Sequence, residues 1–484
     1  MTIRYRRAPR LPVTTKASHK ILLWLVAAGF FMQTLDATIV NTALPAMART
    51  FKESPLRMES VIIAYSLTMA MLIPASGWLA DQFGTRTTFF AAIALFVLGS
   101  VLCAASSSLH ELTAARVLQG AGGSMLLPVG RLALLRDVPR SDFLQAMAFV
   151  SIPGLVGPLI GPTLGGWLSQ YSSWHWIFLV NVPVGALGAA ATLKFMPQYR
   201  GAHPGRFDLT GYLMIAAAMV AISLGLDGLS ELHLRHASVV ILLVFGLAAL
   251  SGYWLHAAQS PAPLFTPQLF RIPSFSIGLL GNLFARIGSG SVPFLLPLTL
   301  QVGLGYSPAR AGVMMIPTAA AAILTKRLIS PLIKQFGYRR VLIANTALVG
   351  SAIASFALIS ASQPVWVRVV QLAAFGAVNS LQFTAMNTLT LKDLEARNAS
   401  GGNSLLSMVQ MVSMSFGVAT AAALLTEFTQ VLDASAPAHV LHAFQATFVS
   451  VGVITTAAAW IFSQLSSAVK GAAPPDPTVE VIPS

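Results

Sequence analysis

The sequence predicts an all-α polytopic membrane protein in which two related six-helix halves are separated by an inserted helix pair, with both termini cytoplasmic. Of the 484 residues, 55% are hydrophobic and 10% are charged, whereas soluble proteins carry about 25% charged residues. Apolar runs of about 20 residues, the length that crosses a hydrocarbon core, recur along the whole chain. Short motifs also recur at a nearly constant offset, which indicates an internal duplication.

Fourteen apolar runs are long enough to span a bilayer, and an even number of spans places both termini on one side. The first run follows six basic residues and no acidic residue, which holds the N-terminus in the cytoplasm. This run is long enough to remain as a span, so we expect no cleavable signal peptide. The spans lie near residues 21–43, 60–80, 88–107, 112–134, 145–168, 174–196, 209–227, 237–257, 274–302, 308–330, 340–361, 365–389, 402–426 and 443–466.

The net charge of +14 is distributed as a topology signal rather than as a patch that binds nucleic acid. In the predicted topology, the cytoplasmic side receives 21 of the 30 Lys and Arg residues, the opposite side receives five and the spans hold four. This asymmetry follows the positive-inside rule. The single cysteine, Cys103, lies in an apolar run, so no intrachain disulfide can form and we expect no metal site.

Three motif pairs indicate that spans 1–6 and 9–14 are related halves. DQFGTR at 81–86 matches KQFGYR at 334–339, and SPLR at 54–57 matches SPAR at 307–310, both at an offset of 253. RVLQ at 116–119 matches RVVQ at 368–371 at an offset of 252. Two six-span halves around a midplane site form a transporter architecture. The predicted division is a basic N-terminal segment (1–20), an N-terminal half (21–200), a two-span insert with linkers (201–272), a C-terminal half (273–467) and a disordered tail (468–484).

Four motifs carry a resemblance to a known family: LDATIVNTALP (35–45), GWLADQFGTR (77–86), RVLQGAGG (116–123) and GPTLGG (161–166). Together they resemble the major facilitator superfamily and, within it, the fourteen-span drug:proton antiporter family. The likeness covers essentially the whole chain, including MNTLTLKDL (386–394) and GNSLLSM (402–408). It implies the major facilitator fold.

The resemblance implies a multidrug efflux antiporter that exports small organic compounds across a bacterial inner membrane. Such a protein is driven by the proton-motive force without a cofactor, and its partners are its substrate, protons and the lipid bilayer; we expect a monomer. An exporter dedicated to one metabolite is the alternative. A polytopic intramembrane enzyme is less favoured, because no span carries a metal-ligand spacing or a nucleophile beside a base.

The loop motif GWLADQFGTR departs from the usual pattern of the superfamily. Gln82 and Thr85 stand where basic residues are common, which leaves Arg86 as the only base of the motif. The resemblance implies that this loop forms a cytoplasmic charge latch centred on Asp81. Its candidate conformational residues are Gly77, Asp81, Gly84 and Arg86.

Span 5 contains three prolines and five glycines in residues 151–168. Gly154, Gly157, Gly161 and Gly165 are spaced 3, 4 and 4 residues apart, so they form one stripe along a helix. Such a stripe lets two helix backbones approach closely in lipid, and ordinary helix packing is its simplest interpretation. The resemblance implies instead a contact between the halves that limits leak. The candidate residues are Gly157, Gly161, Pro162, Gly165 and Gly166.

Charged residues inside spans are candidate functional sites, because each must be paired, hydrated or moved to the interface. Asp36 lies about 15 residues into span 1, or ~22 Å from the cytoplasmic side. Arg116 enters span 4 at a similar depth, so the two can pair; the alternatives are a structural pair and snorkelling of Arg116 to the outer interface. Burial favours a neutral Asp36 and Arg116 favours an ionised one, so their separation would switch proton affinity. We therefore predict that this pair couples protons to transport.

A central substrate cavity is predicted between the halves. The offset of 253 pairs Arg286 with Gln33, and Arg286 lies ~18 Å into span 9, too deep to snorkel easily. A fixed cation there disfavours purely cationic compounds unless Asp36 pairs with it. The apolar candidates suit amphipathic molecules, although aromatic side chains in a bundle more often simply pack. The cavity candidates are Phe30, Gln33, Asn41, Tyr65, Phe284, Arg286 and Met386.

Overall fold

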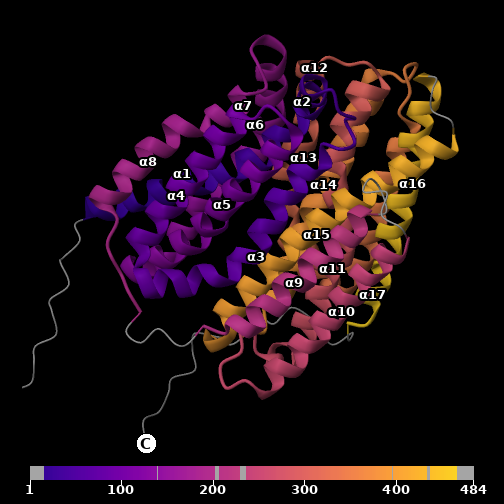
Figure 1. The fold of residues 1–484 in the computed structure, drawn as a ribbon. Helices are drawn as coiled ribbons and strands as arrows, with labels where there is room; N and C mark the ends of the chain where they lie inside the picture. Colours follow the sequence, from indigo (N-terminus) through magenta and orange to yellow (C-terminus); the bar gives the residue numbers. More distant parts are fainter. Residues whose placement is uncertain are drawn as a thin grey trace, which may run out of the picture.

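In this computed structural model, residues 16–138, 140–201, 207–228, 236–394, 396–432 and 437–465 are described, and the regular elements within them are helices (Figure 1). Most of the predicted N-terminal segment and the predicted tail 468–484 lie outside the described residues. The helices of the first half are α1 (Lys16–Ile39), η1 (Val40–Thr42), α2 (Leu44–Phe51), α3 (Glu59–Phe83), α4 (Thr85–Ala105), α5 (Leu109–Asp137), α6 (Arg140–Tyr171), α7 (Trp176–Leu179) and α8 (Asn181–Phe195).

The helices that follow form the inserted pair and the second half. The inserted pair consists of α9 (Leu209–Gly228) and α10 (His236–Gln259). The second half contains η2 (Pro267–Arg271), α11 (Pro273–Leu298), η3 (Thr299–Gly303), α12 (Pro308–Met314), α13 (Ile316–Ser355), η4 (Phe356–Leu358), α14 (Val365–Leu391), α15 (Ala396–Val431), α16 (Pro437–Ala457) and α17 (Ala459–Ser463).

Each of the fourteen predicted spans falls on a helix in the described part of the chain, which confirms the all-helical polytopic fold. Within these residues, ten helical segments are long and apolar enough to cross a membrane. One of them, Pro308–Leu358, is 51 residues long and contains two predicted spans. The side of the membrane on which the termini lie stays a prediction.

The backbone repeats at the offset that the motifs indicate. Gly84, between α3 and α4, has φ 93° and ψ 153°. Gly337, which lies 253 residues later, interrupts α13 with φ 75° and ψ 161°. L-residues with a side chain rarely adopt this region, so glycine is required at both turns. The two long apolar helices on either side of each glycine are therefore joined by the same sharp turn.

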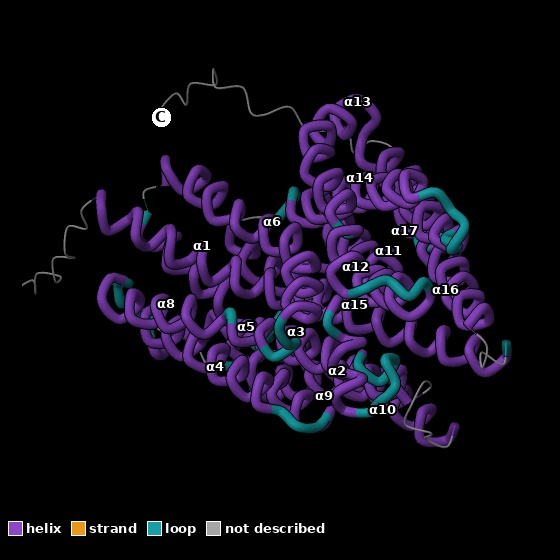
Figure 2. The backbone as a smooth tube through the Cα atoms, turned by 90° about the horizontal axis from the view of Figure 1, so that it is seen from above, coloured by secondary structure: helices purple, strands orange, loops and turns teal. Residues whose placement is uncertain are grey.

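The halves pack on each other through two symmetry-related contacts. Within the first half, α1 packs on α6, and α4 packs on α5 and α8; within the second, α13 packs on α14 and α16, and α11 packs on α15 (Figures 1 and 2). Between the halves, α6 packs on α12 and α3 packs on α15. The inserted pair α9 and α10 lies against α15 through α9. One apolar cluster contains buried residues of both halves, among them Ile39, Leu44, Leu295 and Phe448.

Candidate functional site

A buried ion pair lies inside the first half. It joins Arg116 of α5 to Asp36 of α1. The Nη1 atom of Arg116 donates to Asp36 Oδ2 at 2.6 Å. The side chains are 1% and 0% exposed, respectively. The predicted pair is therefore present, and Arg116 does not snorkel to the interface. Its role in proton coupling stays a prediction.

Two amides complete the surroundings of the Asp36 carboxylate. Gln119 Nε2 and Asn181 Nδ2 donate to Asp36 Oδ1 at 2.8 and 3.2 Å. Both amides also donate to the Ser100 hydroxyl, at 2.8 and 3.4 Å. Gln119 Oε1 in turn accepts from Arg116 Nη1 at 2.7 Å. The carboxylate is thus held by donors from α5 and α8, and it is fully shielded from water.

The Arg116 guanidinium is fixed on its remaining sides by neutral groups. Its Nε donates to the Val61 carbonyl at 3.2 Å. Its Cζ lies 4.0 Å from the ring centre of Tyr65, on α3, an arrangement in which a cation is attracted to the π face. Because Tyr65 is buried against Arg116, it acts as a wall of the ion pair in this conformation.

The amides of this cluster escaped the sequence analysis, which looked for partners of Asp36 only among charged residues in spans. Gln119 follows Arg116 by three residues, one helical turn along the same face. Asn181 begins α8 three residues after the last aromatic residue of the cluster WHWIF. A polar side chain in the hydrocarbon region needs a partner, and this rule is the signal that points to both residues.

Arg286, on α11, has no carboxylate partner in the described part of the chain. Its Nε and Nη2 atoms are buried without a hydrogen-bond partner, and its Cζ lies 4.3 Å from the ring centre of Phe383, on α14. Asp36 bonds to Arg116 instead. Arg286 is therefore not neutralised by Asp36 in this conformation, and its charge should disfavour a cationic ligand.

The other cavity candidates have diverse surroundings. Gln33 and Asn41, both on or just after α1, each hold a buried side-chain oxygen without a partner. Phe30 faces the backbone of α6 at Gly154. Met386 is buried in the core of the second half, whereas Phe284 is 46% exposed. Their role as cavity lining stays a prediction.

The glycine stripe of α6 packs on α1 of its own half. A Cβ atom added at Gly157, Gly161 or Gly165 would overlap atoms of Thr34, Thr38 or Ile39. Thr38 Oγ1 also lies 3.5 Å from the Gly157 carbonyl oxygen, to which it donates. The contact between the halves is made by a neighbouring face of α6. Within the predicted motif, Gly157, Gly161 and Gly165 thus pack α6 against α1, as ordinary helix packing would, whereas Pro162 and Gly166 contact the other half. The role of the motif in limiting leak stays a prediction.

The contact between the halves is reciprocal. A Cβ atom at Gly166 of α6 would overlap the Pro308 carbonyl, and one at Gly312 of α12 would overlap the Pro162 carbonyl. Thr163 Oγ1 donates to the Gly312 carbonyl at 3.1 Å. Backbones touch at this crossing, and only glycine fits.

Two further hydrogen bonds tie the halves together at the same end of the bundle. Gln301 Nε2, in η3, donates to the carbonyl of Thr42, in η1, at 2.9 Å. The Ala309 N–H donates to Gln170 Oε1, at the end of α6, at 3.0 Å. Thr42 is itself anchored to α6, because its Oγ1 donates to the Pro162 carbonyl at 3.1 Å. This end of the interface is therefore closed; the predicted topology places it outside the cell.

In the last turn of α3, Asp81 forms an ion pair with Arg136 of α5 at 2.5 Å. Its carbonyl also accepts from the Gly201 N–H at 3.1 Å. Arg86, at the start of α4, has no ion pair in the described part of the chain. The base that pairs with Asp81 is Arg136 of α5 instead. A Cβ atom at Gly84 would overlap Gln198, whereas one at Gly77 would meet nothing within 4 Å. Of these residues, the structure brings only Asp81 into an ion pair.

The fold and the buried charges define a class of protein: a multi-pass membrane transporter with two related halves and an ion pair inside one of them. In the described ranges, no three His, Cys, Asp or Glu side chains gather closely enough to hold a metal ion. The profile of the Major Facilitator Superfamily matches residues 26–418 and 278–479. The chain belongs to this superfamily, and it is a transporter rather than an enzyme.

Close relatives align with more than nine-tenths of the chain. A protein of Pectobacterium atrosepticum named "Putative multidrug resistance protein MdtD" is 50% identical over 453 residues, covering 94% of this chain and 97% of its own. A protein of the same name from Salmonella heidelberg is 50% identical over 448 residues, covering 92% and 94%.

Among solved structures, an auto-inhibited POT family peptide transporter superposes with a TM-score of 0.68 at 13% identity, covering 95% of this chain and 99% of its own. A POT family transporter in complex with 5-aminolevulinic acid superposes with a TM-score of 0.66 at 16% identity, covering 92% and 95%. At these identities the likeness shows the fold alone.

Proposed function

We propose that this transporter is a proton-coupled exporter of small organic compounds, a multidrug efflux antiporter. The observation that carries the proposal is the buried Asp36–Arg116 pair, since an ionisable pair inside a span is costly and marks an ion or proton pathway. The names of the relatives support the substrate class. The bacterial inner membrane, cytoplasmic termini, a monomeric state and the two-half division of the chain belong to the same proposal.

The geometry supports a simple coupling step. In the ionised state Asp36 accepts from Arg116, Gln119 and Asn181. When rocking of the halves opens this cluster to the outside, protonation of Asp36 releases the Arg116 guanidinium and leaves a neutral carboxyl. Protonation changes the charge of the Asp36–Arg116 pair from zero to +1, so an inside-negative potential favours inward movement of the protonated pair by ~2.3 kcal/mol per 100 mV. Deprotonation toward the cytoplasm restores the pair.

Proton flux from reconstituted vesicles tests the proposal directly. The purified protein is placed in vesicles with a pH-sensitive dye inside, and a panel of amphipathic compounds is added. We expect substrate-dependent proton movement that is abolished in Asp36→Asn. Transport of a compound without any proton movement would contradict coupling, and an unresponsive protein across the whole panel would contradict polyspecific export.

An exporter dedicated to one metabolite is the second candidate, and Arg286 favours it. Among the described residues its buried guanidinium has no carboxylate partner, so a ligand with a negative charge would satisfy it and a purely cationic one would be repelled. Binding of one organic anion and one organic cation of similar size is measured in the wild type, Arg286→Lys and Arg286→Gln. We expect anion preference in the first two and its loss in the third. A clear cation preference of the wild type contradicts this assignment.

A further inference from the structure

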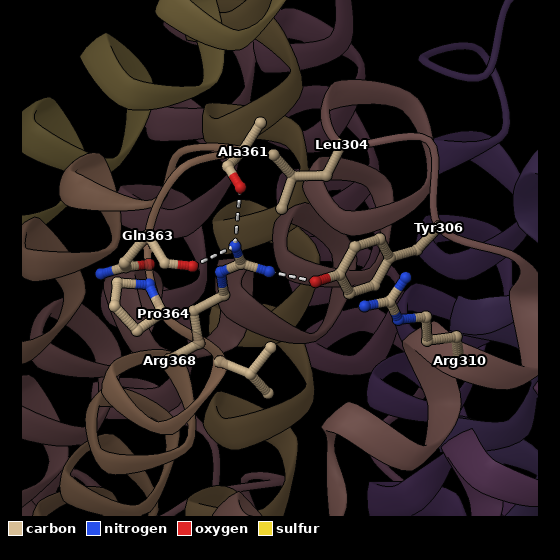
Figure 3. Close-up of a pocket in the computed structure, with 8 residues that line it drawn as sticks. Leu304, Tyr306, Arg310, Ala361, Gln363, Pro364 and Arg368 are labelled. Carbon is tan, nitrogen blue, oxygen red and sulfur yellow. Dashed lines mark hydrogen bonds between the residues drawn. The ribbon is translucent and has the colours of Figure 1, made fainter.

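A second cationic site lies in the loops of the second half, next to the contact between α6 and α12. A cavity of about 320 Å³ opens among the loop before α12, the loop after η4 and the first turns of α12 and α14 (Figure 3). This volume is near the lower end of the range of small-molecule pockets. Its principal lining residues are Leu304, Tyr306, Arg310, Gln363, Val365 and Arg368.

Arg368 is the buried charge of this pocket. It is 3% exposed, and its Nη2 donates to the carbonyls of Ser360 and Gln363 at 2.9 and 2.6 Å. Its Nη1 donates to the Tyr306 hydroxyl, and its Nε is buried without a partner. Every acceptor that it reaches is neutral. A buried guanidinium compensated only by neutral dipoles still attracts a counter-ion.

Arg310 contributes a second cation on the other side of Tyr306. Its Cζ lies 4.0 Å from the Tyr306 ring centre, and Figure 3 shows the two guanidinium groups on either side of this side chain. Because the Tyr306 oxygen accepts from Arg368, its own O–H proton is left as a donor. The pocket therefore combines two guanidinium groups with a hydroxyl donor, and its lining contains no carboxylate.

Comparison of the two halves shows that, among the described residues, Arg310 and Arg368 lack the carboxylate partners of their equivalents in the first half. By the offsets of 253 and 252, Arg310 corresponds to Arg57 and Arg368 to Arg116. In the first half each has an acid: Arg57 pairs with Glu53 at 2.6 Å, and Arg116 pairs with Asp36. The position that corresponds to Glu53 is Tyr306 itself. Both arginines of the second half have thus lost their carboxylates and converge on the residue that replaced one of them.

We propose that this pocket binds an anionic oxygen group, a phosphate or a carboxylate, that takes the place of the lost carboxylates. The guanidinium groups of Arg310 and Arg368 supply the charge, and the Tyr306 hydroxyl donates to the anion. The ligand is either a phospholipid headgroup or a free anion. The site holds the loops before α12 and α14 together and does not depend on the proposed transport function.

Ligand-dependent stability of the whole protein tests the site. Melting is measured in lipid nanodiscs of phosphatidylcholine, with and without phosphatidylglycerol, and separately in phosphatidylcholine with increasing inorganic phosphate. The variants are Arg310→Gln, which changes an exposed side chain, and Tyr306→Phe, which keeps the ring beside Arg310. The matched control is Arg49→Gln, which removes an exposed arginine in α2 at the same end of the bundle.

We expect one anion to raise the melting temperature of the wild type and of Arg49→Gln. Each pocket variant should weaken the apparent affinity by roughly tenfold, the effect of losing one charge-assisted hydrogen bond. A response to phosphatidylglycerol alone assigns the lipid, and a response to phosphate assigns the free anion. No response in the wild type, or equal responses in all four proteins, overturns the site and indicates an adventitious surface effect.

Discussion

At the scale of single residues, the buried Asp36 carboxylate accepts hydrogen bonds from three side chains, those of Arg116, Gln119 and Asn181. Two of them are neutral amides, so removing Arg116 alone would not leave the carboxylate without hydrogen bonds. Removing Asp36 is different, because the Arg116 guanidinium would keep only the Val61 carbonyl and Gln119 Oε1 as acceptors. Loss of Asp36 should therefore destabilise the protein more than loss of Arg116.

Asp36→Asn should abolish uphill transport while keeping downhill exchange, because the residue can no longer release a proton. It should also lower stability, since breaking a buried ion pair costs about 3–5 kcal/mol. The double variant Asp36→Asn/Arg116→Gln removes the orphaned charge and should recover much of the melting temperature but none of the uphill transport. Substrate accumulation and thermal unfolding are measured in parallel. Unimpaired accumulation by Asp36→Asn would remove it as the coupling residue.

Asp208 is the residue that fastens the inserted helix pair. It is 6% exposed; its Oδ1 lies 2.7 Å from His256 Nε2, and its two oxygens accept from the N–H groups of Gly211 and Leu264 at 2.9 and 3.0 Å. Burial alone raises the pKa of Asp208, but these hydrogen bonds together outweigh it and lower the pKa below its usual value. The carboxylate thus joins the start of α9 to the end of α10.

A lowered pKa predicts stability that is complete above the ordinary carboxyl value and is lost as the pH falls through the lowered value. At neutral pH, Asp208→Asn should therefore lower the free energy of unfolding by roughly 1–3 kcal/mol and melt at a lower temperature than the wild type. The gap should close only below about pH 4. Melting curves of both proteins across acidic pH measure it. A gap that stays constant down to the lowest pH would show that the ionised form of Asp208 is not what stabilises the pair.

At the scale of helices, α6 has two different packing faces. Its glycine stripe lies on α1, and the adjacent positions Pro162 and Gly166 lie on α12. The first contact is within a half and moves with it, whereas the second must separate whenever this end of the protein opens. Substitutions on the two faces should therefore have different consequences.

Gly166→Ala should impair transport more than stability, because its Cβ would overlap the Pro308 carbonyl when the halves close. Gly401→Ala, in α15, is the matched control, since nothing lies within 4 Å of a Cβ there. We expect normal transport by Gly401→Ala and slow or leaky transport by Gly166→Ala, measured as substrate flux and passive proton leak. Equal behaviour of the two variants would show that the α6–α12 crossing does not need to close this tightly.

At the scale of the whole molecule, the orientation in the membrane underlies the direction of transport. If both termini are cytoplasmic, the loop between α9 and α10 faces outward. Glu231→Cys in a Cys103→Ser background should then react with a membrane-impermeant thiol reagent added to intact cells. Arg206→Cys is the control on the opposite side and should react only after the membrane is opened. Labelling in the reverse order would overturn the fourteen-span topology.

The helices and the repeat could be predicted because both depend on short stretches of sequence. Apolar length marks each span, and DQFGTR and KQFGYR both mark a turn with a positive-φ glycine. The Asp36–Arg116 pair followed from the similar depth of the two residues and from the resemblance, which implies that spans 1 and 4 are neighbours. The partners of Asp81 and Arg368 did not, because they depend on how distant helices face each other. Arg136 lies 55 residues from Asp81, and nothing in the local sequence selects it over Arg86.

If protons are coupled as proposed, the second half limits the concentration ratio that the transporter can maintain, because it has no carboxylate equivalent to Asp36. By the offset of 253, the position equivalent to Asp36 is Ser289, which cannot exchange a proton at physiological pH. In the proposed mechanism Asp36 is the carboxyl that exchanges a proton, so each cycle would couple a single proton. For a neutral substrate, a driving force of 100 mV then supplies about 2.3 kcal/mol, which sustains at most a roughly fiftyfold concentration ratio. A cell relying on this protein would lower its internal burden of a compound by that factor and no further.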